Sequence, residues 1–320
     1  MTPPVLSVDG LRVTIDGRPV VDGVDFSVEA GEIVTLVGES GCGKSMTAFA
    51  VMGLLPQVAR QEGGNIWLGG EPIGKGRRSG LRGTNMAMIF QEPVASLNPL
   101  MPIGWQIAEC LIVHRRLTRR EAKRQTIAML SDVGIPEPEI RYRQYPFELS
   151  GGMCQRAMIA MALITRPKLL IADEPTTALD VTIQAQILEL MKRLRDETNT
   201  AILLITHDMG VVADIADQVA VMYAGRVVET APVDDIFAWQ AHPYTKLLLS
   251  TIPRLDGEAK TLLPTIRGTV PRIGDWPVGC RFSTRCPLAD DDCREDPPLA
   301  PAGLGRLAAC WHQDRVGGLA

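Results

Sequence analysis

Short apolar runs alternate with longer segments of helical periodicity along the first 225 residues. Strand-like runs of alternating or continuous apolar residues, bounded by turn residues, fill most of the first 37 residues and recur at 65–68, 86–90, 168–172, 201–206 and 218–225. Segments of helical length and spacing occur at 44–55, 105–133, 150–164 and 182–197. Strands that alternate with helices predict an α/β fold with a mainly parallel sheet flanked by helices.

The chain changes in composition after Gly225. Two short helical segments at 233–239 and 244–250 precede a stretch rich in proline and glycine at 253–279, which predicts a linker. A segment that contains several cysteines follows the linker.

Residues 38–45 read GESGCGKS and match the pattern G-x-x-x-x-G-K-[ST] between a predicted strand and a predicted helix. Glycines in this pattern let backbone N–H groups turn toward phosphate oxygens without a Cβ clash, and the helix N-terminus faces the same anion. Lys44 would contact the β- and γ-phosphates, and the Ser45 hydroxyl would bind Mg²⁺. Cys42 would contribute only its backbone. The loop therefore predicts nucleotide binding through Gly38, Ser40, Gly41, Cys42, Gly43, Lys44, Ser45 and Met46.

The segment LLIADEP at 169–175 is an apolar strand that ends in two carboxylates. Ligands bind at the carboxyl ends of strands in parallel sheets. Asp173 would hold the Mg²⁺ shell, and Glu174 would orient or deprotonate an attacking water. Alone this pattern also fits an ordinary strand end, but beside a phosphate loop it indicates nucleotide hydrolysis.

Further motifs in this order resemble those of ATP-binding cassette (ABC) ATPases over residues 5 to about 235. LSGGM at 149–153 resembles the signature motif, ALD at 178–180 the D-loop, Gln91 in IFQEP the Q-loop glutamine, and His207 in LLITHD the switch histidine. The resemblance implies a P-loop NTPase core of ABC type with an antiparallel β subdomain and a helical subdomain at about 91–157. It also implies ATP and Mg²⁺ as cofactors.

The resemblance further implies roles for single residues. Glu174, His207 and Gln91 would be catalytic, with Gln91 also a Mg²⁺ ligand, and the segment after Gln91 would dock membrane subunits. Two such domains would enclose two ATP molecules, each contacted by the phosphate loop of one domain and the signature motif of the other. The residues that would complete the nucleotide site in this way are Ser150, Gly151, Gly152 and Asp180.

One position departs from the family pattern. ABC ATPases usually stack adenine on an aromatic residue at the end of an early strand, and here that position falls on Ile15. Base stacking on an aromatic ring contributes roughly 1–3 kcal/mol in nucleic-acid complexes. We therefore expect the chain to discriminate weakly between ATP and GTP.

Four of the seven cysteines lie in the last forty or so residues, spaced Cys280-x5-Cys286-x6-Cys293-x16-Cys310. Four clustered thiols predict a four-coordinate metal or cluster site, and the spacing alone does not separate zinc from iron–sulfur. Buried packing residues and disulfides are the alternatives.

Three segments resemble the oligopeptide/dipeptide branch of ABC importers: SLNP at 96–99, LSGGMCQR at 149–156 and HPYT at 242–245. In that branch a C-terminal four-cysteine extension can carry a [4Fe–4S] cluster, here shielded by Phe282, Leu288 and Trp311. The resemblance thus implies three parts: an ABC nucleotide-binding domain at 1–235, helices and a linker at 236–279, and a cysteine-rich extension at 280–320.

The net charge and the distribution of apolar residues limit the classes of function that fit this chain. A net charge of −4 argues against a nucleic-acid binder, and no secretory signal or membrane-spanning run stands out. We expect a peripheral protein on the cytoplasmic face of the cell membrane that hydrolyses ATP to drive peptide uptake. Its expected partners are two permease subunits, a second homologous ATPase subunit and an extracytoplasmic solute-binding protein. The alternatives are an ABC ATPase uncoupled from transport, or an importer of nickel or another small solute.

Overall fold

The computed structural model describes residues 2–74, 78–177, 179–252, 265–303 and 305–319. The chain forms two compact units, each assembled from separate stretches of sequence. The helical unit comprises residues 1–6, 28–33 and 67–204, and the phosphate-loop unit comprises residues 7–27, 34–66 and 205–320. No helix in the described ranges is long and apolar enough to cross a membrane.

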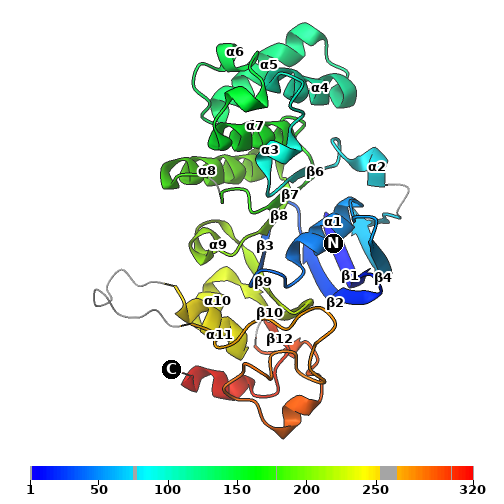
Figure 1. The fold of residues 1–320 in the computed structure, drawn as a ribbon, viewed down its shortest axis with the longest axis vertical. Coiled ribbons are helices and arrows are strands. Elements are labelled where there is room, and N and C mark those ends of the chain that lie inside the picture. Colours follow the sequence, from blue (N-terminus) through cyan, green and yellow to red (C-terminus); the bar gives the residue numbers. More distant parts are fainter. Residues whose placement is uncertain (1, 75–77, 178, 253–264, 304, 320) are drawn as a thin grey trace. The chain divides into compact units, whose positions relative to one another are not determined.

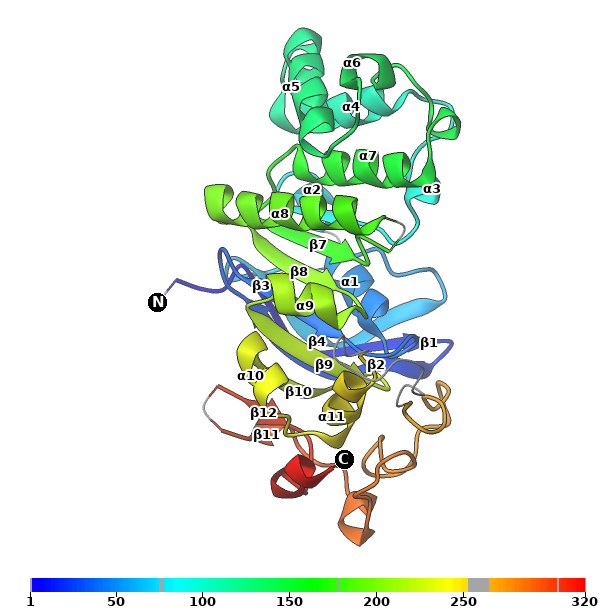
Figure 2. The same ribbon diagram turned by 90° about the vertical axis from the view of Figure 1, so that its left-hand side faces the viewer.

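The helical unit contains a group of helices and one set of neighbouring strands. The strands lie in the order β8 (Ala201–Ile205), β7 (Leu169–Asp173) and β6 (Met86–Ile89), and β6 and β7 are parallel. The helices around them are α2 (Arg78–Leu81), α3 (Pro93–Ser96), α4 (Ile103–Arg115), α5 (Arg119–Asp132), α6 (Pro138–Arg141), the 3-10 turn η1 (Pro146–Glu148), α7 (Gly151–Leu163) and α8 (Val181–Thr198). Figures 1 and 2 show α7 and α8 running side by side. The short strand β5 (Glu71–Pro72) pairs with the end of β4 (Ala59–Leu68).

The phosphate-loop unit contains strands from two sheets. One has the order β2 (Arg18–Val28), β1 (Leu6–Ile15) and β4. The other runs β11 (Ala300–Pro301), β12 (Leu307–Ala308), β10 (Arg226–Pro232), β9 (Gln218–Tyr223) and β3 (Ile33–Val37). Only the β3–β9 pair among these four neighbouring pairs is parallel. The helices are α1 (Lys44–Met52), α9 (Met209–Ile215), α10 (Val233–Ala238) and α11 (Pro243–Ser250).

Several expected elements end at other residues, for physical reasons. The helix expected at 44–55 ends at Met52, because Gly53 adopts the left-handed conformation (φ 67°) and its N–H bonds the carbonyl of Ala50. The helical segment expected at 105–133 is two helices, and Arg116, also left-handed (φ 54°), ends the first of them. Helix α9 and strand β10 are not predicted by the sequence pattern. The predicted linker falls in part on residues 253–264, which lie outside the described residues.

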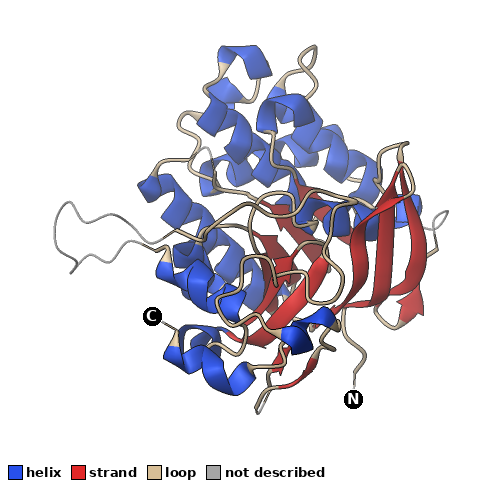
Figure 3. Ribbon diagram, turned by 60° about the horizontal axis from the view of Figure 1, so that its bottom comes forward, coloured by secondary structure: helices blue, strands red, loops and turns tan. Residues whose placement is uncertain are grey.

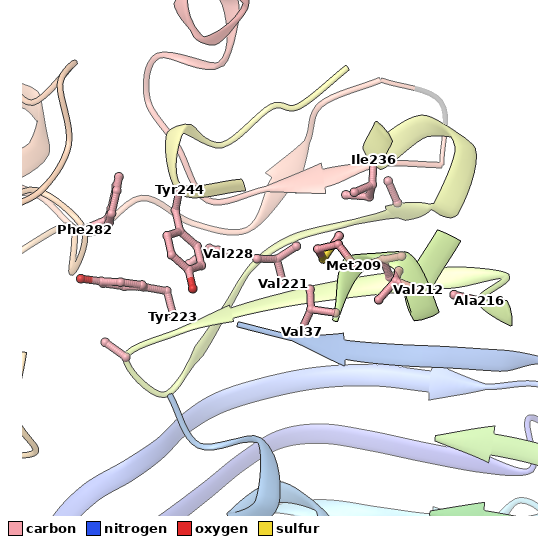
Figure 4. Packing of buried hydrophobic residues seen from close by; sticks show 13 residues of the cluster. Val37, Met209, Val212, Ala216, Val221, Tyr223, Val228, Ile236, Tyr244 and Phe282 are labelled. Atoms are coloured by element: carbon pink, nitrogen blue, oxygen red, sulfur yellow. The ribbon is translucent and has the colours of Figure 1, made fainter. Parts of the chain in front are cut away.

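A buried aromatic cluster joins the C-terminal segment to the rest of the phosphate-loop unit. The Phe282 ring lies edge-on to Tyr223, with centroids 5.1 Å apart, and 5.4 Å from Tyr244. Figure 4 shows these three rings beside aliphatic residues that include Val37 and Val221. Residues 265–319 consist mainly of loops (Figure 3), with the short 3-10 turns η2 (Asp291–Arg294) and η3 (Gln313–Gly318). Residues 265–319 have few helices and strands to hold them in place. Burial of side chains such as Phe282 therefore contributes to fixing this segment.

Candidate functional site

The predicted phosphate loop connects β3 to α1 in the phosphate-loop unit. Gly38, Gly41 and Gly43 all have positive φ values, of 150°, 81° and 104°. A Cβ atom on Gly38 would lie 2.2 Å from the Met222 carbonyl oxygen, and one on Gly43 would lie 2.9 Å from that of Val20. Only glycine fits these two positions, because both the backbone angle and the space exclude a side chain.

Lys44 is buried at the start of α1, and its ammonium group turns back over the loop. Nζ donates to the carbonyl oxygens of Gly38 over 2.7 Å and of Glu39 over 3.1 Å. Cys42 is fully buried beneath the loop, and burial raises the pKa of its thiol. The Cys42 side chain therefore acts in packing. Ser45 and Met46 are half-buried in the first turn of α1.

Two other predicted site residues lie in the same unit. Ile15 is half-buried and ends β1. His207 is exposed and directly precedes Asp208, the N-cap of α9, whose carboxylate accepts hydrogen bonds from the N–H groups of Gly210 and Val211. The cap fixes the backbone that carries His207.

The helical unit brings Gln91, Asp173 and Glu174 together at one end of its strands. Strands β6 and β7 pair in parallel up to Ile89 and Ala172, so the residues that follow them emerge at the same edge. Asp173 is buried (2% exposed). Gln91 Nε2 donates to Glu174 Oε2 over 3.2 Å, and Thr177 Oγ1 donates to the same oxygen over 3.1 Å.

Glu174 has a left-handed backbone conformation, with φ 49°. A side chain with a Cβ atom reaches this region only against steric resistance, and such conformations cluster at functional sites. The two hydrogen bonds to Oε2 fix the position of the carboxylate beside Gln91.

The predicted signature and D-loop residues sit at helix N-termini of the helical unit. Ser150 is the N-cap of the 13-residue helix α7, where its hydroxyl accepts a hydrogen bond from the Met153 N–H over 3.3 Å. A Cβ atom on Gly151 would meet nothing within 4 Å, so packing does not require glycine there. Asp180 caps the 18-residue helix α8 by accepting from the Ile183 N–H. Ala178 of the predicted D-loop lies outside the described residues.

The four C-terminal cysteines gather in one region of the phosphate-loop unit. The Cys280 N–H donates to the Cys293 carbonyl over 3.0 Å. Burial, followed by the neighbouring thiols, raises the pKa of Cys286 to about 11 and of Cys310 to about 12. Asp290, Cys293 and His312 have ligand atoms within 4.8 Å of one another, the one such group of three in the described part of the chain.

Two residues at the phosphate loop, Tyr244 and Arg285, are not predicted by any sequence motif. Both contact Glu39, the second residue of the loop, from 205 and 246 positions away. Tyr244 belongs to the HPYT segment, whose resemblance concerns the importer branch and not the phosphate loop. No local pattern marks such distant pairs, although Arg285 lies between two of the clustered cysteines.

Known proteins with similar sequences belong to the family that the phosphate loop and the neighbouring motifs indicate. The family model "ABC transporter" matches residues 21–177, and "Oligopeptide/dipeptide transporter, C-terminal region" matches residues 228–293. The oligopeptide transport ATP-binding protein AppD of Bacillus subtilis is 50% identical over 308 residues, 93% of this chain and 92% of that protein. OppD of Salmonella typhimurium is 49% identical over 313 residues, 96% of this chain and 93% of that protein.

Solved structures show the same fold. The ATP-binding cassette MJ0796, bound to ADP and Pi, is 23% identical, with a TM-score of 0.65 over 71% of this chain and 98% of that one. The cbiO1 subunit of an ABC transporter complex from Clostridium perfringens is 28% identical, with a TM-score of 0.63 over 73% of this chain and 91% of that one. The fold is therefore the ABC ATPase P-loop fold with mixed α/β sheets, as the motifs predicted. The chain belongs to the ABC transporter ATPases of the oligopeptide/dipeptide importer type and is the ATP-hydrolysing subunit of a peptide importer.

Proposed function

We propose that this chain binds Mg·ATP through its phosphate loop and hydrolyses it with Glu174 as the general base, in a dimer with a second ATPase subunit. The observation that carries this proposal is the hydrogen bond from Gln91 to Glu174, which couples the Q-loop residue to the carboxylate. In this scheme His207 contacts the γ-phosphate, and the second subunit contributes its Ser150, Gly151 and Gly152 equivalents. Asp180 completes the dimer interface, and Ile15 covers the base.

The residues present fit Mg²⁺. The ion prefers oxygen ligands in octahedral geometry and retains several waters. The Ser45 hydroxyl, the Asp173 carboxylate and the Gln91 side-chain carbonyl supply such oxygens. When bound, Mg²⁺ neutralises phosphate charge. Lys44 would hold the β- and γ-phosphates, and Glu174 would accept the proton of the attacking water.

We also propose that the helical unit docks permease subunits at the cytoplasmic face of the membrane. Three large apolar side chains there are strongly exposed: Val94 (61%) and Leu100 (83%) after Gln91, and Phe147 (74%) before the signature motif. Apolar side chains that gather into one exposed patch mark interaction sites. Val94 and Leu100 follow Gln91 closely in sequence, so docking at this segment would be coupled to the hydrolytic residues.

Reconstitution tests the transport function. The chain would be assembled with its permease and ATPase partners in lipid vesicles, and the solute-binding protein would be supplied loaded with dipeptide, longer peptide or Ni²⁺. We expect peptide-loaded binding protein to stimulate ATP hydrolysis and peptide accumulation. Stimulation by Ni²⁺ alone would replace the peptide assignment, and hydrolysis without any accumulation would indicate an ATPase uncoupled from transport.

We further propose that Cys280, Cys286, Cys293 and Cys310 bind a [4Fe–4S] cluster that fixes the C-terminal segment. All are thiols in one region, a donor set that fits iron–sulfur and zinc. Four thiolates on one zinc ion, at about 2.3 Å each, would lie about 4 Å apart. No three of these thiols lie within 4.8 Å of one another in residues 265–303 and 305–319. A cluster, in which each thiolate binds a different iron, does not need its ligands this close together.

Zinc is the second candidate, because Asp290, Cys293 and His312 are close enough to share one ion. Arg315, however, donates to Asp290 over 3.3 Å and would compete with that ion. Iron, acid-labile sulfide and zinc should be measured on anaerobically purified protein, Cys286→Ser and the control Cys110→Ser. About four irons and four sulfides, lost only in Cys286→Ser, would support the cluster. Stoichiometric zinc without sulfide, or neither metal, would overturn it.

A further inference from the structure

Glu39, inside the phosphate loop, is held from two sides by residues of the C-terminal half of the chain. Its backbone N–H donates to the Tyr244 hydroxyl over 2.8 Å. Its carboxylate accepts two hydrogen bonds from Arg285, Nη1 to Oε2 over 2.6 Å and Nη2 to Oε1 over 3.0 Å. This is the two-pronged arginine–carboxylate pairing, which fixes orientation as well as charge.

Arg285 is itself held firmly. Its side chain is only 3% exposed. Nε donates to the Arg267 carbonyl over 2.9 Å, and the guanidinium lies 5.7 Å from the centre of the Tyr223 ring. Among the contacts described for Arg285, Glu39 supplies the one negative charge, so the two residues form a charge pair at the phosphate loop.

The loop that carries Arg285 is anchored at other points. It comprises residues 281–285, between Cys280 and Cys286. Arg281 bonds the Asp22 carboxylate and the Ala224 carbonyl and stacks on Trp276 at 3.6 Å. Phe282 is buried between Tyr223 and Tyr244 (Figure 4). Anchored this way, the loop gives Arg285 a fixed position relative to Glu39.

The pair has an electrostatic consequence for ATP. A carboxylate in a phosphate-binding loop would repel the phosphate groups of the nucleotide, and the repulsion is strong where water is partly excluded. Arg285 neutralises that carboxylate. It also holds Glu39, whose carbonyl accepts from Lys44 Nζ, so the same contact helps to fix the lysine.

We propose that Arg285 is a positioning residue for ATP: it neutralises and orients Glu39, and thereby sets the affinity of the phosphate loop for nucleotide. This role depends on ATP binding by the loop and is independent of which metal the cysteines hold. It makes a C-terminal residue part of the nucleotide site without contact to the nucleotide.

Steady-state ATP hydrolysis by the full-length chain tests the proposal in Arg285→Gln, Arg285→Lys, Glu39→Gln and the double variant Glu39→Gln/Arg285→Gln. Arg294→Gln is the matched control, an exposed arginine of the same segment that pairs with Asp291. We expect Arg285→Gln to raise KM for ATP about tenfold while kcat changes less than twofold. The expected tenfold rise in KM is smaller than the effect of breaking a fully buried charge pair, because Glu39 is 31% exposed and water partly solvates its carboxylate. Arg285→Lys, which loses the fork but keeps the charge, should fall between Arg285→Gln and the parent.

The double variant separates neutralisation from simple loss of structure. With Glu39→Gln present no carboxylate is left unpaired, so KM should return to within about threefold of the parent value. An unchanged KM in Arg285→Gln would overturn the proposal, as would a double variant as impaired as the single one. Metal content and thermal midpoint, measured on the same samples, would reveal a variant that has lost its C-terminal segment. A raised KM that comes with lost metal or a lowered thermal midpoint, and that the double variant does not restore, would count against the proposal. A parent chain that holds no metal but shows the expected pattern of KM values would overturn the cluster and leave the role of Arg285 intact.

Discussion

The side-chain amide of Gln91 bonds the carboxylate of Glu174 across two parallel strands, with Nε2 and Oε2 3.2 Å apart. The two residues are 83 positions apart in sequence, and the pairing of β6 with β7 brings them to one edge. A movement of the segment after Gln91 would therefore change the position of the Glu174 carboxylate. In the proposed scheme, this contact would transmit permease docking to the hydrolytic step.

Glu174→Gln should abolish most hydrolysis and leave nucleotide binding intact. The amide cannot accept a proton, and loss of a general base lowers kcat by about 10²- to 10⁴-fold. Phosphate release and equilibrium ATP binding would be measured side by side, with Glu197→Gln, an exposed residue of α8, as control. Near-parental hydrolysis in Glu174→Gln would show that another group activates water.

Ile15→Tyr should strengthen ATP binding and sharpen base selectivity. A tyrosine at the end of β1 could stack on adenine, and stacking of roughly 1–3 kcal/mol corresponds to about fivefold or more in KM. Turnover of ATP and GTP would be compared in both proteins. A parent chain that already prefers ATP strongly would contradict the interpretation of Ile15.

His242 should make stability fall as the pH is lowered from about 7.5 to about 5.5. It is fully buried, burial lowers its pKa to about 3, and its Nδ1 accepts the Tyr244 N–H over 3.0 Å. Below the unfolded pKa of about 6.5 only the unfolded state binds the proton, so the folded state loses about 1.4 kcal/mol over this range.

The comparison with His242→Asn isolates this effect, since asparagine can keep the cap at Tyr244 but does not titrate. Burial raises the pKa of neighbouring Glu229, which acts with the opposite sign but is present in both proteins. The difference in free energy of unfolding between the two should shrink as the pH falls. A difference constant with pH would mean that His242 is not the titrating group.

Phe282→Ala should destabilise the chain by about 3–5 kcal/mol, the usual effect of removing a buried phenyl ring. The ring is 1% exposed and touches two tyrosines. Phe147→Ala removes the same atoms from a 74% exposed site and should change stability by about 0.5 kcal/mol or less. Denaturant unfolding would measure both. Equal effects would indicate that the C-terminal segment is not anchored by Phe282.

Leu100→Glu should weaken assembly with the permease without affecting hydrolysis by the isolated chain. The residue is 83% exposed, so a charge there is tolerated alone but buried without a partner on docking. Val113→Glu, at a 60% exposed position of α4, serves as control. Co-purification from detergent extracts would be scored. Full assembly with Leu100→Glu would place the docking surface elsewhere.

Local motifs predict the phosphate loop, the carboxylates at the end of β7 and a helix start at Ser150. The structure has a helix start at Ser150 and a strand end at Asp173, because each is set by a few adjacent residues. The pairing of Glu39 with Arg285 could not be predicted in this way. It joins a turn to a loop with little regular structure, which is held by tertiary contacts such as the packing of Phe282 and the ion pair of Arg281 with Asp22.

The long separation of Glu39 and Arg285 bears on how the protein is made. A ribosome adds roughly 5–20 residues per second, so the 246 residues between the two positions take roughly 12–50 s to synthesise. Throughout that interval the nascent phosphate loop carries an unneutralised carboxylate and lacks its arginine. Nucleotide binding of full strength therefore begins only when the cysteine-bearing segment has emerged, which delays ATP turnover by incomplete chains.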